Sequence, residues 1–135
     1  MPLTRANVTA ASRLTLPMYP ALYFGVGLAF LLQDPTRTSG PAFDVARSIM
    51  GIHAWGLIFA TVAAVETWAL LSQHRRPYVL ALIPGAGLAG FWAVVLFGSA
   101  IGSPFVSYTS GMWVAGMAVA QAASARSLAR YETSP

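Results

Sequence analysis

Two ionisable residues, His53 and Glu66, lie in the longest apolar run of the sequence, residues 48–73. A helix that crosses a membrane needs about 20 mostly apolar residues, and this run is long enough. An ionisable side chain inside such a span is costly to insert and is, by default, a candidate for proton or ion handling. His53 and Glu66 are therefore the candidate functional residues of the chain.

His53 could serve as a metal or haem ligand only with a second ligand close by. The only other histidine is His74, 21 residues further along. On one helix that spacing corresponds to about 31 Å, so one chain cannot hold a haem between the two. No His-x-x-His or Glu-x-x-His pair occurs either. We expect His53 to be a neutral histidine that packs between helices and hydrogen-bonds to a neighbouring one, and we predict no metal site and no cofactor.

Glu66 lies about 10 Å inside the end of this span and leaves three interpretations open. It could relay protons or ions across the membrane. It could be a structural residue that bonds to Gln121, Ser124 or Arg126 of a later span. It could also be protonated, or extend toward the surface. His53 is 13 residues away, about 20 Å along the helix and about 220° around it, so the two residues do not form one site.

Motifs of enzymes are missing from the sequence. It has no cysteine, no nucleophile elbow and no zinc-protease motif. Residues 85–90 match G-x-G-x-x-G, but no strand precedes them and they lie inside an apolar helix, which argues against dinucleotide binding. We therefore expect no enzyme and no catalytic residue.

The composition indicates that the surface of the protein faces lipid rather than water. Of the 135 residues 56% are hydrophobic and 9% charged, and the mean hydropathy is +0.62; soluble domains average about 25% charged. The arginines stand singly or in pairs beside apolar runs, without the basic stripe of a nucleic-acid-binding protein. The sequence predicts an all-α, polytopic integral membrane protein with one domain, residues 1–135, and the lipid bilayer rather than nucleic acid as its partner.

Four transmembrane helices are predicted to form a bundle, at about residues 16–32, 45–72, 78–100 and 105–125. Tyr19 and Tyr23, near the start of the first, suit a membrane interface. Pro84 is expected to bend the third helix, because proline removes a backbone hydrogen bond.

The arginines also predict the orientation. Six of the eight fall in the N-terminal arm, the turn at 73–77 and the C-terminal tail, which four spans place on one side. The positive-inside rule then puts both termini in the bacterial cytoplasm. The orienting residues of the turn and the tail are Arg75, Arg76, Arg126 and Arg130.

Small residues spaced four apart recur on three of the predicted spans and allow helix backbones to approach closely. They serve either packing within one bundle or self-association of several chains. The residues concerned are Gly56, Ala60 and Ala64 on the second span, Gly85 and Ala89 on the third, and Gly116 and Ala120 on the fourth.

All the basic residues are arginine, a bias found in GC-rich genomes such as those of actinobacteria and their phages. Over residues 45–130 the chain also resembles small four-span membrane proteins of actinobacterial phages and prophages, some of which are called holin-like. The resemblance is carried by Ala54-Trp55-Gly56-Leu57, Phe91-Trp92-Ala93-Val94-Val95, Gly102-Ser103-Pro104 and Ala123-Ser124-Ala125-Arg126-Ser127. It implies a protein that oligomerises in the cytoplasmic membrane and permeabilises it.

Two other functions fit the same sequence. The chain could be a prophage exclusion or defence protein that blocks a competing phage by binding a partner or leaking ions. It could also be a structural accessory subunit of a larger bacterial membrane complex, with other membrane subunits as its partners.

Overall fold

The computed structural model describes residues 16–34, 41–72, 75–102 and 108–130, and in these ranges the chain is helical without strands. The helices are α2 (Met18–Leu32), α3 (Pro41–Ile49), α4 (Ile52–Leu71), α5 (Arg75–Gly102) and α6 (Tyr108–Arg130). The all-α class predicted from the sequence is thus confirmed.

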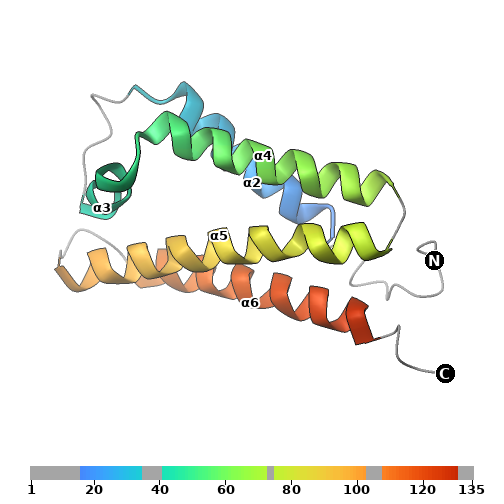
Figure 1. The fold of residues 1–135 in the computed structure, drawn as a ribbon. Helices are drawn as coiled ribbons and strands as arrows, with labels where there is room; N and C mark the ends of the chain where they lie inside the picture. Colours follow the sequence, from blue (N-terminus) through green and yellow to red (C-terminus); the bar gives the residue numbers. More distant parts are fainter. Residues whose placement is uncertain (1–15, 35–40, 73–74, 103–107, 131–135) are drawn as a thin grey trace.

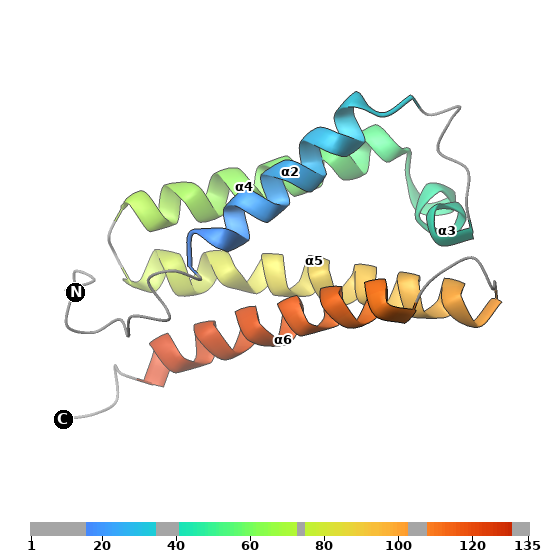
Figure 2. The ribbon, with the colours of Figure 1, turned by 180° about the vertical axis from the view of Figure 1, so that it is seen from behind.

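The four long helices form two pairs. Helix α2 packs along α4 and helix α5 packs along α6, and the pairs meet mainly through α4 and α5 (Figures 1 and 2). The short helix α3 lies at the end of the bundle where α5 ends, and it contacts α5. Each of the four long helices buries one face in the interior of this bundle.

The predicted helix over 45–72 is wrong as a single element. The structure divides it into α3 and α4, which are separated at Met50 and Gly51. Gly51 has an extended backbone (φ −61°, ψ 153°), and glycine is a weak helix former, so the chain can turn there at little cost. The indole of Trp55 donates a hydrogen bond to the Ala46 carbonyl oxygen (2.9 Å), which fixes α3 against α4.

The other predicted helices are present with shifted ends. Helix α5 begins before the predicted residue 78 and continues through Pro84 without a break. Helix α6 begins at Tyr108 and extends to Arg130, beyond the predicted end at 125. The predicted start at 105 lies outside the described residues.

Two helices of the described segments are long and apolar enough to cross a membrane: residues 52–71 of α4 and 76–101 of α5. Helix α2 is apolar but has 15 residues, which gives a length of about 22 Å. Helix α6 has sufficient length but is less apolar than α4 and α5.

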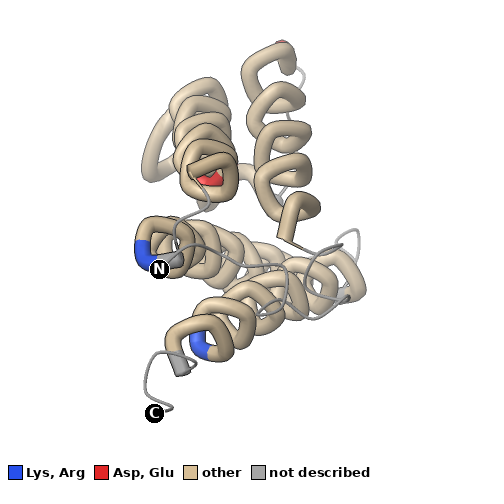
Figure 3. Tube along the Cα trace, turned by 90° about the vertical axis from the view of Figure 1, so that its right-hand side faces the viewer, with Lys and Arg blue, Asp and Glu red and all other residues tan. Residues whose placement is uncertain are grey.

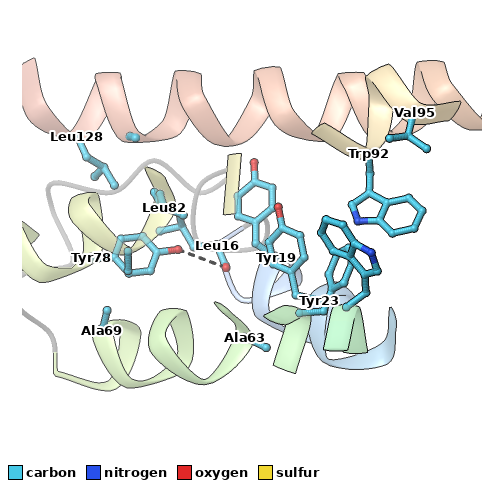
Figure 4. Packing of buried hydrophobic residues seen from close by; sticks show 14 of the residues in the cluster. Leu16, Tyr19, Tyr23, Ala63, Ala69, Tyr78, Leu82, Trp92, Val95 and Leu128 are labelled. Atoms are coloured by element: carbon cyan, nitrogen blue, oxygen red, sulfur yellow. Dashed lines mark hydrogen bonds between the residues drawn. The ribbon is translucent and has the colours of Figure 1, made fainter. Parts of the chain in front are cut away.

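Aromatic rings fill the core near the middle of the bundle. The indole of Trp92 packs against five other rings, with centroid distances of 5.4–6.3 Å; they belong to Phe30, Phe43, Trp55, Phe59 and Phe91. In Figure 4, Trp92 and Val95 lie on one side of Tyr19 and Tyr23, and Tyr78 and Leu82 lie on the other. The two tyrosines predicted at the membrane interface are therefore part of the buried core.

Candidate functional site

Three of the polar side chains enclosed in this core contact one another. Glu66 and Gln121 are 0% exposed and Tyr23 is 1% exposed. A buried polar group costs free energy unless it finds hydrogen-bond partners, so their contacts decide what the site can do.

The three side chains form one hydrogen-bonded cluster, which we call the polar cluster. The Gln121 side-chain nitrogen donates to Glu66 Oε1 at 2.5 Å. The Tyr23 hydroxyl lies 2.6 Å from Gln121 Oε1 and 2.7 Å from the carbonyl oxygen of Gly85. Tyr23 belongs to α2, Glu66 to α4, Gly85 to α5 and Gln121 to α6. The polar cluster therefore joins all four long helices and links the α2–α4 pair to the α5–α6 pair.

The second carboxyl oxygen of Glu66 has no hydrogen-bond partner. Glu66 Oε2 is buried, and no donor reaches it within the described structure. A side chain that bonds through one oxygen only has not used all of its bonding capacity. The polar cluster is thus the one place among the described residues where a buried ionisable group is incompletely satisfied.

Gly85 makes room for this cluster. A Cβ atom at this position would overlap Glu66 Oε1 and the Gln121 side-chain nitrogen. The sequence predicted Gly85 as a helix-packing residue. In the structure, its missing side chain lets two polar side chains from α4 and α6 meet against the backbone of α5.

Tyr78 closes the core toward the end where α5 begins. It is fully buried, and its hydroxyl donates to the Leu16 carbonyl oxygen at 3.3 Å (Figure 4). Glu66 is near enough to interact electrostatically with the hydroxyls of Tyr23 and Tyr78.

His53 is not part of the polar cluster. Its side chain is exposed rather than packed between helices, which corrects the expectation from the sequence. Its Nε2 lies 3.1 Å from the Gln33 carbonyl oxygen, just beyond the end of α2. This contact does tie it to a neighbouring segment, as expected. Within the described ranges, no group of three or more His, Cys, Asp or Glu is arranged to hold a metal ion.

The predicted packing residues divide into two sets. Those that face the bundle interior are Gly56, Gly85 and Ala89, with Ala60 half-buried. Those that face outward are Ala64, Gly116 and Ala120, and nothing lies within 4 Å of a Cβ placed at Gly116. Packing within the bundle therefore accounts for the first set only.

The sequence singled out Glu66 and named Gln121 as one of three partners, and the structure shows Gln121 in that place. Tyr23 was missed, because a tyrosine near the start of an apolar helix is typical of a membrane interface. No local pattern marks its contact with a residue 98 positions away.

No protein-family model matches the chain, and no curated protein or solved structure matches it either.

Proposed function

We propose that the chain is a multi-pass protein of the bacterial cytoplasmic membrane that self-associates in the bilayer and permeabilises it, as the holin-like proteins that it resembles are expected to do. The observation that carries this proposal is the distribution of side chains: large apolar side chains are exposed on the outside of the bundle, and the polar cluster is enclosed within a mostly apolar core.

Large apolar side chains are exposed on every long helix of the bundle. Trp113 is 80% exposed, Ile101 78% and Val94 72%. Smaller exposed fractions, still above one third, are found at Phe24, Leu57, Leu80 and Val119, among others. Water disfavours so many exposed large apolar side chains, whereas hydrocarbon tolerates them. Glu66 and Gln121, by contrast, are in the interior, as expected for polar residues in a membrane bundle.

The arginines support the proposed orientation. Helix α4 ends, α5 begins and α6 ends at one end of the bundle (Figure 1). Figure 3, which looks at this end, shows basic residues at the start of α5 and near the end of α6. Arg75 and Arg76 belong to the start of α5, and Arg126 and Arg130 to the last turns of α6. Their position at one end of the bundle supports the proposal that this end faces the cytoplasm.

The outward face of α6 supports self-association. Gly116 and Ala120 are exposed one turn apart, and the large apolar side chains of Met112, Trp113 and Val119 surround them. Small residues at this spacing let a second helix approach closely, so that van der Waals contacts can replace contacts with lipid. A second copy of α6 is the simplest partner for this face.

Expression in a bacterium tests permeabilisation. Induction of the full chain is expected to collapse the membrane potential, followed with a voltage-sensitive dye. The double substitution Gly116→Leu with Ala120→Leu should delay or abolish the collapse, because leucine side chains keep a second α6 away. Gly87→Leu is the matched control: Gly87 is also exposed, with open space around it, but lies on α5 between the larger residues Ile83 and Phe91.

Crosslinking of the same three proteins in membranes should show oligomers for the natural chain and for Gly87→Leu, and fewer for the double variant. Normal growth and an intact membrane potential at high expression would refute the proposal.

A groove favours a second candidate, a structural subunit of a larger membrane complex. It has a volume of about 730 Å³ and lies between α2 and α4. Its lining is almost wholly apolar and includes Pro20, Phe24, Ala64 and Trp68. Such a surface could receive a helix of another subunit. Purification from membranes in mild detergent would separate the two functions, since a subunit brings a different protein in fixed stoichiometry.

A further inference from the structure

We propose that Glu66 is a proton-binding site. In the assembled bundle its carboxyl group carries a proton, and this hydroxyl begins a chain of hydrogen bonds through Gln121 and Tyr23 to the Gly85 carbonyl oxygen. The inference goes beyond the proposed function, because it concerns the ligand of the polar cluster and holds whether or not the protein permeabilises membranes.

The Tyr23 hydroxyl has one hydrogen but two short contacts with other oxygens. Its hydroxyl oxygen is close to two other oxygens, Gly85 O at 2.7 Å and Gln121 Oε1 at 2.6 Å. A phenol has a single hydrogen and can donate one strong hydrogen bond. If the amide oxygen of Gln121 faces Tyr23, one of these two short oxygen–oxygen contacts has no hydrogen and is repulsive.

A half-turn of the Gln121 amide removes this conflict. The oxygen and nitrogen of an amide have nearly the same shape, and their positions follow from the hydrogen-bond network. With the amide turned, Gln121 donates to the Tyr23 hydroxyl, and Tyr23 donates to the Gly85 carbonyl oxygen. Each of the two short contacts of the Tyr23 hydroxyl then contains one hydrogen.

The same half-turn places the Gln121 oxygen against Glu66 Oε1. Two oxygens in contact need a hydrogen between them, and only a protonated carboxyl group can supply it. The observed separation of 2.5 Å is at the short end for O–H···O hydrogen bonds, which run from about 2.5 to 3.0 Å, and is below the range for N–H···O, about 2.7 to 3.2 Å. The distance therefore agrees with a hydroxyl donor on Glu66.

The surroundings of Glu66 favour the neutral form as well. The titratable groups that face it are Tyr23 from α2 and Tyr78 from α5, with Tyr19 beside them, and Gln121 faces it from α6. None of these groups is a cation. Arg126, further along α6, is exposed. A carboxylate in this interior would be a buried charge with one unpaired oxygen, whereas a protonated carboxyl carries no net charge.

The proton on Glu66 also has a structural role. Ionisation would remove the hydrogen between Glu66 and Gln121 and loosen the link between the two helix pairs.

Isotope-labelled glutamate tests the proposal directly. The chain has two glutamates, Glu66 and Glu132. Carbon-13 at the side-chain carboxyl carbon therefore gives two nuclear magnetic resonance signals in the full chain in lipid vesicles. The variant Glu132→Gln identifies the signal of Glu66 without altering the polar cluster.

At pH 6 an ordinary glutamate is about 98% ionised. We expect the Glu66 signal at pH 6 to have the chemical shift of a protonated carboxyl and the Glu132 signal that of a carboxylate. The substitution Gln121→Leu should move the Glu66 signal and leave that of Glu132 unchanged. An ionised Glu66 at pH 6, with the fold intact by circular dichroism, would overturn the proposal. A membrane that stays sealed would contradict the proposed function and leave this result standing.

Discussion

Gly85 illustrates how one residue without a side chain controls a site made by others. Its carbonyl oxygen accepts the Tyr23 hydrogen bond, and the space beside its Cα is occupied by Glu66 and Gln121. In an ordinary helix position alanine is more favourable than glycine by about 1 kcal/mol. At this position the space requirement outweighs that preference.

Replacement of Gly85 by alanine should therefore destabilise the bundle, by roughly 1–3 kcal/mol, because a Cβ atom would force the polar cluster apart. The change is measured from the loss of helicity in mixed micelles as the fraction of denaturing detergent rises. Gly87→Ala, two residues along and exposed to open space, should be neutral or stabilising by up to about 1 kcal/mol. Equal effects of the two substitutions would show that the polar cluster needs no space at Gly85.

At the scale of elements, the α2–α4 pair is defined by a close backbone contact. A Cβ atom at Gly27 would lie 2.9 Å from the Ala60 amide nitrogen and 3.0 Å from the Gly56 carbonyl oxygen. Backbone atoms cannot move aside as a flexible side chain can. The two glycines thus set the distance between these helices, and with it the position of Tyr23 relative to Glu66.

The substitution Gly27→Ala is expected to push α2 away from α4 and to lower the stability by about 1–3 kcal/mol. Gly25→Ala on the same helix, where nothing lies within 4 Å of the new Cβ, is the control and should cost nothing. The same detergent titration compares them. If Gly27→Ala were as stable as its control, the close approach of α2 and α4 would be refuted.

At the scale of the whole molecule, the proposed orientation follows from the two ends of the bundle. The start of α5 and the end of α6 carry arginines at one end, and α3 with Asp44 and Arg47 lies at the other. If both termini are cytoplasmic, α3 lies on the outer side of the membrane. The acidic and the basic residue of α3 balance each other, as the positive-inside rule permits on that side.

The absence of cysteine from the sequence makes this orientation simple to test. A single cysteine at Asp44, which is exposed on α3, should react with a membrane-impermeant maleimide in intact cells. A cysteine at Arg76, also exposed, should react only after the membrane is opened. Each cysteine is best introduced into the double variant Gly116→Leu with Ala120→Leu, because the membrane must stay sealed during labelling. The reverse labelling pattern would show that the termini lie outside the cytoplasm.

The sequence alone determined the helical class, the approximate positions of the long helices and the choice of Glu66 as the residue to examine. These follow from local properties: the length of an apolar run, the breaks between runs and the cost of a carboxyl group inside one. One of the three interpretations of Glu66 drawn from the sequence named Gln121, Ser124 and Arg126 as partners, and in the structure Gln121 bonds to Glu66.

Only the tertiary structure decided which faces meet. It brought Tyr23 and the Gly85 carbonyl to Gln121, turned Gly56 inward and Gly116 outward, and divided the predicted second helix at Gly51. In so apolar a chain, every face of a helix is apolar enough to be buried. The periodicity of the sequence therefore cannot show which face is buried. The rotation of each helix about its axis is set by contacts between residues 55 to 98 positions apart, and these depend on the fit of whole surfaces rather than on any local pattern.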